Sequence, residues 1–250
     1  MTKSAWAAFT AAREHYREGL KRFRQSVRGL KTLQQRLVDR RSGPAYTVRD
    51  AVVYNQALDD LEAADDIRLI LVGDNPGRRE QETGRYLVGP SGKIAEGFFR
   101  GAPELGIDFR RNVLILNKTP VHTPRTAELR ELCRMGEPDL AACIAETQRF
   151  MASLLLEFQR ALSRPAHPVP VWITGYSEMR RGGIFDPYTT ALAELYAGAK
   201  PFLREQVFLY RHFSMNQFSA DLRRQTLEGE GVRAALDRIG RSYRRRILGW

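Results

Sequence analysis

The sequence predicts an α/β protein with a central parallel sheet that helices cover on both faces. Short runs of uninterrupted apolar residues alternate along the chain with longer amphipathic segments. Strands that are apolar at every position are typical of parallel sheets buried on both sides, and their alternation with helices is typical of α/β folds. We therefore expect a three-layer α/β/α arrangement around a four-stranded parallel sheet, with a helical extension at the N-terminus.

Four apolar runs are the expected strands. They are IRLILVG (67–73), NVLILN (112–117), PVWITG (170–175) and QVFLYRH (206–212). Polar residues or glycines lie at the end of each run, and ligands of open parallel sheets bind beyond the carboxyl ends of the strands. The sequence therefore predicts a pocket where these four ends meet.

Helices are expected between the strands, at 92–104, 139–162 and 188–198, and a basic helix is expected from about residue 219. One further helix is expected over 5–40, because an apolar stripe repeats there at steps of three and four residues. The stripe consists of Leu20, Phe23, Val27, Leu30 and Leu37. Since Arg and Lys surround it, we expect this helix to pack on the core with a basic face exposed.

The charge of the chain points to a polyanionic partner. The 250 residues include 40 Lys and Arg against 29 Asp and Glu, a formal net charge of +11. An excess of this kind is typical of proteins that bind nucleic acid. The two cysteines, Cys133 and Cys143, fit no disulfide scaffold and no zinc or iron–sulfur spacing. With no apolar run long enough for a membrane span and no signal peptide, we expect a cytoplasmic protein, nucleoid-associated if bacterial.

The segment VGPSGK (88–93) is similar to a phosphate-binding loop, but it does not match the P-loop pattern. A P-loop needs glycine five positions before Gly92 and a hydroxyl residue after Lys93, and the chain has Leu87 and Ile94 there. No dinucleotide-binding fingerprint follows the first strand either. We therefore predict that this loop binds no ATP or GTP.

The order of the motifs resembles the uracil-DNA glycosylase superfamily over about residues 67–225. The first expected strand ends in GDNPG (73–77), and GRYLVGPSGK (84–93) follows. The second ends in LNK (116–118) before TPVHTPRT (119–126), and the fourth ends in HFSMN (212–216). Asn75 is similar to the single-strand-selective and mismatch-specific branches, and residues 84–92 are similar to the thermophile-type branch, without its iron–sulfur cysteines. The resemblance implies one domain over 1–250, with 1–45 as a basic extension and 67–225 as the glycosylase-like core.

The resemblance also implies the roles of the catalytic residues. Asn117 would read the Watson–Crick edge of a flipped base. His212 would stabilise the negative charge that builds on the departing base. Either Asp74 or Asn75 would position the attacking water, and the sequence leaves that choice open.

The remaining site residues are implied in the same way. Gly73, Pro76 and Gly77 would line the substrate pocket together with Tyr86 and Leu87. The residues that would contact DNA are Gly89, Ser91, Gly92, Lys93, Ser214, Met215 and Asn216. Leu87 stands where the thermophile-type branch has a stacking Phe, and Tyr86 stands in place of Pro. Either Tyr86 supplies the stacking ring, or the pocket has none.

The expected function is that of a DNA-repair glycosylase that hydrolyses the bond between uracil, or a related damaged base, and deoxyribose. It would need no metal and no cofactor, would act as a monomer and would bind DNA rather than membranes. A second class stays open, a catalytically degenerate nucleic-acid-binding module on the same fold.

Overall fold

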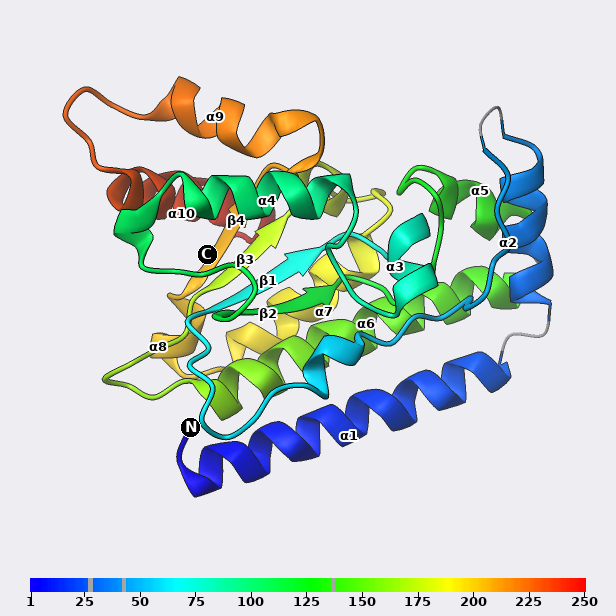
Figure 1. Cartoon of the computed structure of the whole chain (residues 1–250), viewed down its shortest axis with the longest axis horizontal. Helices are drawn as coiled ribbons and strands as arrows, with labels where there is room; N and C mark the ends of the chain where they lie inside the picture. The colour runs from blue at the N-terminus through cyan, green and yellow to red at the C-terminus, as the bar shows by residue number, and fades with distance from the viewer. Residues whose placement is uncertain (27–28, 42–43, 136–137) are drawn as a thin grey trace.

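Four parallel strands form a single sheet in the computed structural model, which describes residues 1–26, 29–41, 44–135 and 138–250. The strands are β1 (Leu69–Gly73), β2 (Val113–Asn117), β3 (Val171–Thr174) and β4 (Val207–Tyr210), in the order β2-β1-β3-β4. Every strand residue is buried. The predicted parallel sheet is confirmed, each strand lying within the range expected for it (Figure 1).

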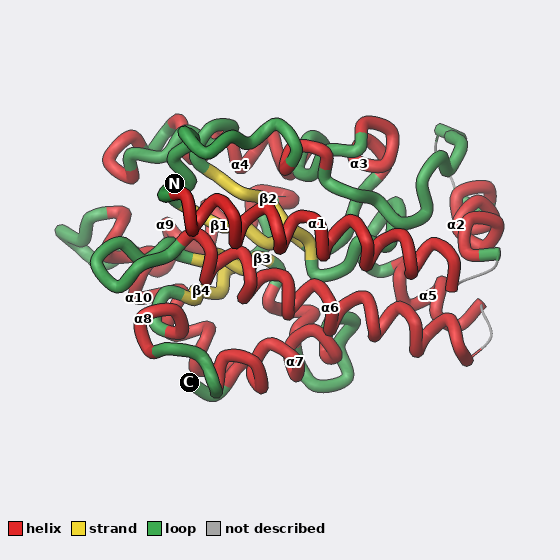
Figure 2. The backbone as a smooth tube through the Cα atoms, turned by 90° about the horizontal axis from the view of Figure 1, so that it is seen from below, coloured by secondary structure: helices red, strands yellow, loops and turns green. Residues whose placement is uncertain are grey.

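One face of the sheet packs against a layer of long helices. Ile70 and Val72 point to this face and share a hydrophobic cluster with α6 (Pro138–Leu162) and α7 (Asp186–Ala197). Helix α1 (Lys3–Ser26) lies along the outside of α6, where Phe9 meets the Phe158 ring at 5.3 Å (Figure 2). This side of the sheet is therefore covered two helices deep.

The opposite face packs against α4 (Pro90–Arg100), α9 (Gln217–Gln225) and α10 (Val232–Leu248). Leu69 and Leu71 point to this side because side chains alternate along a strand. The Trp172 ring is stacked on Phe99 of α4 at 5.5 Å and on Phe218 of α9 at 5.9 Å. Helices on both faces complete the predicted three-layer α/β/α fold.

Helix α10 also covers the outer edge of β4, the last strand in the sheet order. Its Leu236 belongs to the cluster on one face of the sheet, while Ile239 and Tyr243 belong to the cluster on the other. Gly240 lies directly on the strand, since a Cβ there would stand 2.7 Å from the Cβ of Phe208. The helix thereby shields a strand edge that would otherwise present unpaired backbone groups.

The prediction of one helix over 5–40 is wrong in its continuity. The chain forms α1 and a separate α2 (Leu30–Asp39), which is preceded by Gly29 at φ +79°, a left-handed conformation that glycine adopts readily. The predicted packing is confirmed, because Leu20 and Phe23 are buried while Lys21 is exposed. Val27 of the predicted stripe lies outside the described residues.

The basic helix expected from residue 219 is likewise two helices, α9 and α10. Thr226 after α9 is extended, and Gly229 turns the chain at φ +73°. Three short helices were not predicted, namely α3 (Arg78–Thr83), α5 (Glu128–Met135) and α8 (Pro201–Arg204). No helix in the described ranges combines the length and the apolar character that crossing a bilayer requires.

Candidate active site

The carboxyl ends of the four strands bring polar side chains to one edge of the sheet. Asp74 follows β1, Lys118 follows β2, and Gly175 follows β3. A Cβ on Gly175 would lie within 2.4 Å of an Asp74 carboxylate oxygen, so these two strand ends are in contact. His212 after β4 is close enough to Asp74 and Lys118 for both charges to affect its pKa.

A buried ion pair lies at the centre of this edge. The side chain of Lys118 is fully buried, and its Nζ lies 2.5 Å from Asp74 Oδ1 and 2.5 Å from the carbonyl oxygen of Thr174. Thr126 Oγ donates to the other Asp74 oxygen at 3.3 Å. Burial lowers the pKa of Lys118, and the Asp74 carboxylate opposes that shift. These contacts fix the orientation of the Asp74 carboxylate.

The sequence analysis assigned no role to Lys118, although it quoted the residue within the LNK motif. A lysine after a strand is usually solvated, because burying an ammonium group carries a large desolvation cost. The sequence feature that could have indicated a buried lysine here was Asp74, the acidic residue at the end of the neighbouring strand. Only the strand register, which pairs Gly73 with Asn117, brings the residues after them together.

Asn75 points its amide toward the segment that follows β2. Its Nδ2 donates to Thr123 Oγ at 2.8 Å and lies 3.3 Å from the Thr123 carbonyl oxygen. The amide nitrogen of Asn75 therefore holds two loops together, while the adjacent Asp74 faces the other strand ends. Of the two neighbours, Asp74 is the one whose side chain is hydrogen-bonded to a residue directly after another strand, Lys118.

His122 is a buried histidine to which the sequence analysis gave no role. Its Nδ1 donates to the Pro76 carbonyl at 2.8 Å, and its Nε2 lies 3.0 Å from the Tyr46 hydroxyl, which donates to it. Burial lowers the pKa of His122 to about 4, so the ring is neutral at physiological pH. It fastens the loop after β1 to the segment after β2.

Asn117 ends β2 with a side-chain amide that is almost fully enclosed. The residue is 2% exposed, and its Nδ2 has no hydrogen-bond partner in the described part of the chain. Buried donors are nearly always paired in folded proteins, and an unpaired one costs about 1–3 kcal/mol. The Asn117 amide is therefore a donor available to a ligand.

His212 is held in one tautomer by the residue two positions later. Its Nδ1 accepts the backbone N–H of Ser214 at 3.0 Å and lies 2.7 Å from Ser214 Oγ. Because Nδ1 accepts, the proton of the neutral ring is on Nε2. Burial lowers the pKa of His212, with Lys118 acting in the same direction and Asp74 against it. The result is a neutral imidazole with one fixed donor.

Glu80 connects the two glycine-containing loops. Its Oε2 accepts the Gly77 N–H at 2.8 Å, and its Oε1 accepts the Leu87 N–H at 2.7 Å. Burial raises the pKa of this carboxyl to about 7. Leu87 has φ +49°, and a Cβ on Gly92 would collide with the Leu87 carbonyl oxygen at 1.6 Å. The glycine is thus required for the loop to close onto the start of α4.

Residues 61–169 match the family model described as the Uracil DNA glycosylase superfamily. This match supports membership of the chain in the uracil-DNA glycosylase superfamily. The matched segment includes β1, β2 and both glycine-containing loops, with Asp74 and Asn117 inside it. No curated protein matched the chain in a sequence comparison. The superfamily acts on DNA, and its domain supports a glycosylase hydrolase in general.

Tyr86, the aromatic residue in the second uracil-DNA glycosylase motif, lies away from the strand ends. Its hydroxyl donates to the Val53 carbonyl at 2.7 Å and lies 2.7 Å from the Tyr16 hydroxyl of α1. It lines a cavity of about 180 Å³ beside Val113, at the start of β2. The sequence left two alternatives, that Tyr86 supplies the stacking ring or that the pocket has none. The position of Tyr86 in the structure favours the second. Leu87 itself is 5% exposed.

The rim of the candidate site is basic and carries one projecting apolar side chain. Met215 is 84% exposed, and both Met215 and Asn216 adopt positive φ, at 53° and 56°. Lys93 is exposed in the first turn of α4, with Ser91 partly exposed beside it and Gly89 preceding the helix. Further exposed arginines follow the strand ends, and the sequence analysis did not name them: Arg78, Arg79, Arg125, Arg180 and Arg181.

Proposed function

We propose that this chain is a DNA-repair glycosylase that hydrolyses the N-glycosidic bond of uracil, or of a closely related damaged base, in DNA. The observation that carries the proposal is the enclosed Asn117 amide, whose Nδ2 lacks a protein partner among the described residues. A flipped uracil offers a carbonyl oxygen and an N–H side by side. The Asn117 amide can donate to the first and accept from the second.

His212 would act on the leaving base. As the glycosidic bond breaks, its electron pair moves onto the base, and negative charge collects on the base carbonyl oxygens. A neutral imidazole whose Nε2–H is fixed by Ser214 is a preorganised donor for such charge. Removing one donor of this kind costs about 100- to 1,000-fold in rate.

Asp74 would act on the sugar side. Positive charge grows on the deoxyribose as the base departs, and a carboxylate can offset it while accepting a hydrogen bond from the attacking water. The water oxygen bonds to C1′, one water proton passes toward the carboxylate, and the base leaves with the bonding pair. Lys118 and Thr126 would hold the carboxylate in the orientation that this step needs.

The loop that carries Met215 would occupy the space left by the flipped base. An exposed apolar side chain on a turn of two positive-φ residues suits insertion between base pairs. The glycine loops at Gly77 and Gly89 to Gly92, together with Lys93, would contact the DNA phosphates. The positive φ angles of Met215 and Asn216 strain the backbone, and proteins retain strain of this kind mainly at functional sites.

The test uses end-labelled oligonucleotides that contain one uracil, single-stranded and in duplex, followed by alkali to cleave abasic sites. We expect cleavage by the unmodified protein and a loss of about 100-fold or more in Asp74→Asn, His212→Ala and Asn117→Ala. Asp66→Asn and His167→Ala are matched controls, since both residues are exposed and outside the site. DNA retention without cleavage would instead identify a catalytically degenerate binding module on this fold.

A further inference from the structure

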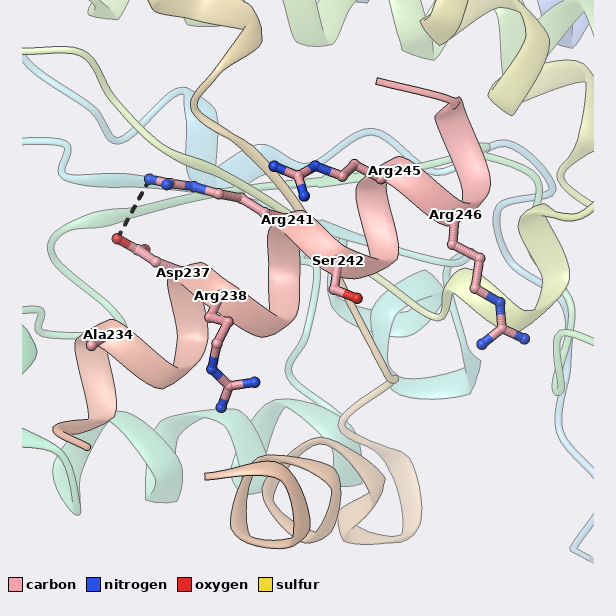
Figure 3. A pocket seen from close by; sticks show the side chains of 7 residues that line it. All are labelled: Ala234, Asp237, Arg238, Arg241, Ser242, Arg245 and Arg246. Carbon is pink, nitrogen blue, oxygen red and sulfur yellow. Dashed lines mark ion pairs between the residues drawn. The ribbon is translucent and has the colours of Figure 1, made fainter. Parts of the chain in front are cut away.

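The solvent face of α10 is strongly basic and lies outside the candidate site. Residues 232–250 contain six arginines and a single aspartate. Four of the arginines, together with Ala234, Asp237 and Ser242, line an open depression of about 820 Å³ (Figure 3). We call Arg238, Arg241, Arg245 and Arg246 the α10 arginine face.

One arginine of this helix, Arg244, has a structural role and differs in this from the arginines of the α10 arginine face. Arg244 is buried, and its guanidinium donates to the backbone carbonyls of Arg204, Glu205, Val207 and Trp250 at 2.9–3.2 Å. Those bonds attach α10 to the segment that enters β4. Among the described residues, the arginine face makes no comparable set of hydrogen bonds to the core, although the Arg241 guanidinium lies 5.8 Å from the centre of the Phe208 ring.

Charge compensation on the arginine face is incomplete and decreases along the helix. Arg238 pairs with Glu230 at 2.6 Å and also donates to the Gln225 carbonyl. Arg241 lies 3.9 Å from Asp237, beyond hydrogen-bond distance. For Arg245 and Arg246, no carboxylate of the described residues lies within ion-pair distance. Both side chains are exposed, so their charge is available to a partner.

The arginine face is separate from the strand ends. In Figure 1 the strand arrows point toward the side of the molecule where α3 lies. Helix α10 lies away from α3, next to the edge strand β4. The apolar side of α10 packs against β4, and Leu236 and Ile239 are almost fully buried there. A helix that binds a membrane surface needs an exposed apolar face, so this arrangement disfavours a lipid partner.

We propose that the α10 arginine face is a second DNA-binding surface, which holds the phosphate backbone of a lesion-free segment while the strand ends examine bases. The identification of DNA rests on the proposed function, but the binding itself does not require catalysis. Guanidinium groups bind phosphate through paired N–H donors, and Arg238, Arg241 and Arg245 repeat on one side of the helix at steps of about 5 Å. A surface of this kind would raise affinity for long DNA independently of its sequence.

The test compares the binding of a lesion-free duplex of about 30 base pairs by the full chain and by Arg241→Glu/Arg245→Glu/Arg246→Glu. Arg238 is left in place because it holds the Gln225 carbonyl. We expect the triple variant to bind at least tenfold more weakly and to lower the slope of log affinity against log salt by about 2–3, as three phosphate contacts require. Excision from a uracil oligonucleotide of a few nucleotides should change less than twofold.

The control is Lys3→Glu/Lys21→Glu/Arg22→Glu on α1, which changes the net charge equally at exposed positions. Equal loss of DNA affinity in both triple variants would overturn the proposal, because it would reflect net charge alone. An unchanged salt slope in the α10 variant would overturn it as well. So would binding of phosphatidylserine vesicles that is lost in the α10 variant while duplex affinity is kept. If the unmodified protein excises no uracil but the salt slopes differ as expected, this proposal stands and the proposed function fails.

Discussion

The side-chain oxygen of Asn117 occupies the space in which Gly73 would carry a side chain. A Cβ on Gly73 would lie 2.5 Å from Asn117 Oδ1, well inside van der Waals contact. The strand register pairs the same two residues across β1 and β2. The absence of a side chain at one strand end thus sets the position of the amide at the next.

Gly73→Ala is therefore expected to inactivate the site without changing any polar group in it. The new methyl must displace the Asn117 amide, and a displacement of about 1 Å can cost on the order of 100-fold in rate. Excision of uracil measured under single-turnover conditions should fall by that amount, with a stability loss of about 1–3 kcal/mol. Gly97→Ala is the control, since nothing lies within 4 Å of a Cβ on this glycine of α4. Full activity in Gly73→Ala would show that the Asn117 position is unimportant.

Lys118→Met should destabilise the protein by about 3–5 kcal/mol, because it leaves the Asp74 carboxylate without its buried partner. Asp74→Leu combined with Lys118→Met should recover part of that loss, since a buried ion pair can often be replaced by apolar side chains. Urea unfolding of both single variants and the double variant gives the coupling energy. Additive losses would contradict the pairing. The double variant should nonetheless excise no uracil.

Glu80 should make the protein less stable as the pH rises from 4.5 to 7. Its carboxyl has a pKa of about 7 in the folded chain against 4.5 when unfolded, so the folded state binds the proton more tightly. The linked loss, complete above pH 7, amounts to at most about 3 kcal/mol. Unfolding free energies of Glu80→Gln, measured across this range, should lack that decline.

The comparison must be made against the unmodified protein, because His122 acts in the opposite direction. Burial lowers the pKa of His122 to about 4, so its contribution is lost as the pH falls from 6.5 toward 4. Subtracting the two pH profiles cancels this term. Glu131→Gln, at an exposed position on α5, is the control and should leave the profile unchanged. Identical profiles for Glu80→Gln and the unmodified chain would contradict the prediction.

His212 should not titrate out of its active form as the pH rises from 7 to 8. Burial holds the pKa of the ring below its ordinary value of 6.5, so the neutral ring dominates above that pH, and Ser214 keeps the proton on Nε2. Nitrogen-15 chemical shifts of the ring report the tautomer directly. The single-turnover rate should be level over this pH range as far as His212 is concerned. A rate that falls with a midpoint near pH 7, and does so only when His212 is present, would refute the assignment.

The sheet could be predicted from sequence because its strands are continuous apolar runs, and such runs depend little on distant residues. The division of the N-terminal helix was less accessible, since Gly29 costs only about 1 kcal/mol within a helix and does not by itself end one. That polar residues meet at the strand ends could be predicted from the sequence, but the pairings between them could not. Lys118 is buried because of Asp74, which is 44 positions away in the chain. Tyr86 lies in the core because of Tyr16, 70 positions away.

The packing of α1 on α6 also constrains the order of events during synthesis. Phe9, Tyr16 and Leu20 leave the ribosome before α6, and that helix, which covers them, ends at Leu162. At 5–20 residues per second, these apolar side chains wait on the order of ten seconds for their partner. During that interval the apolar face of the amphipathic helix α1 is exposed on the nascent chain. We expect a chaperone, or the ribosome surface itself, to shield α1 until α6 emerges.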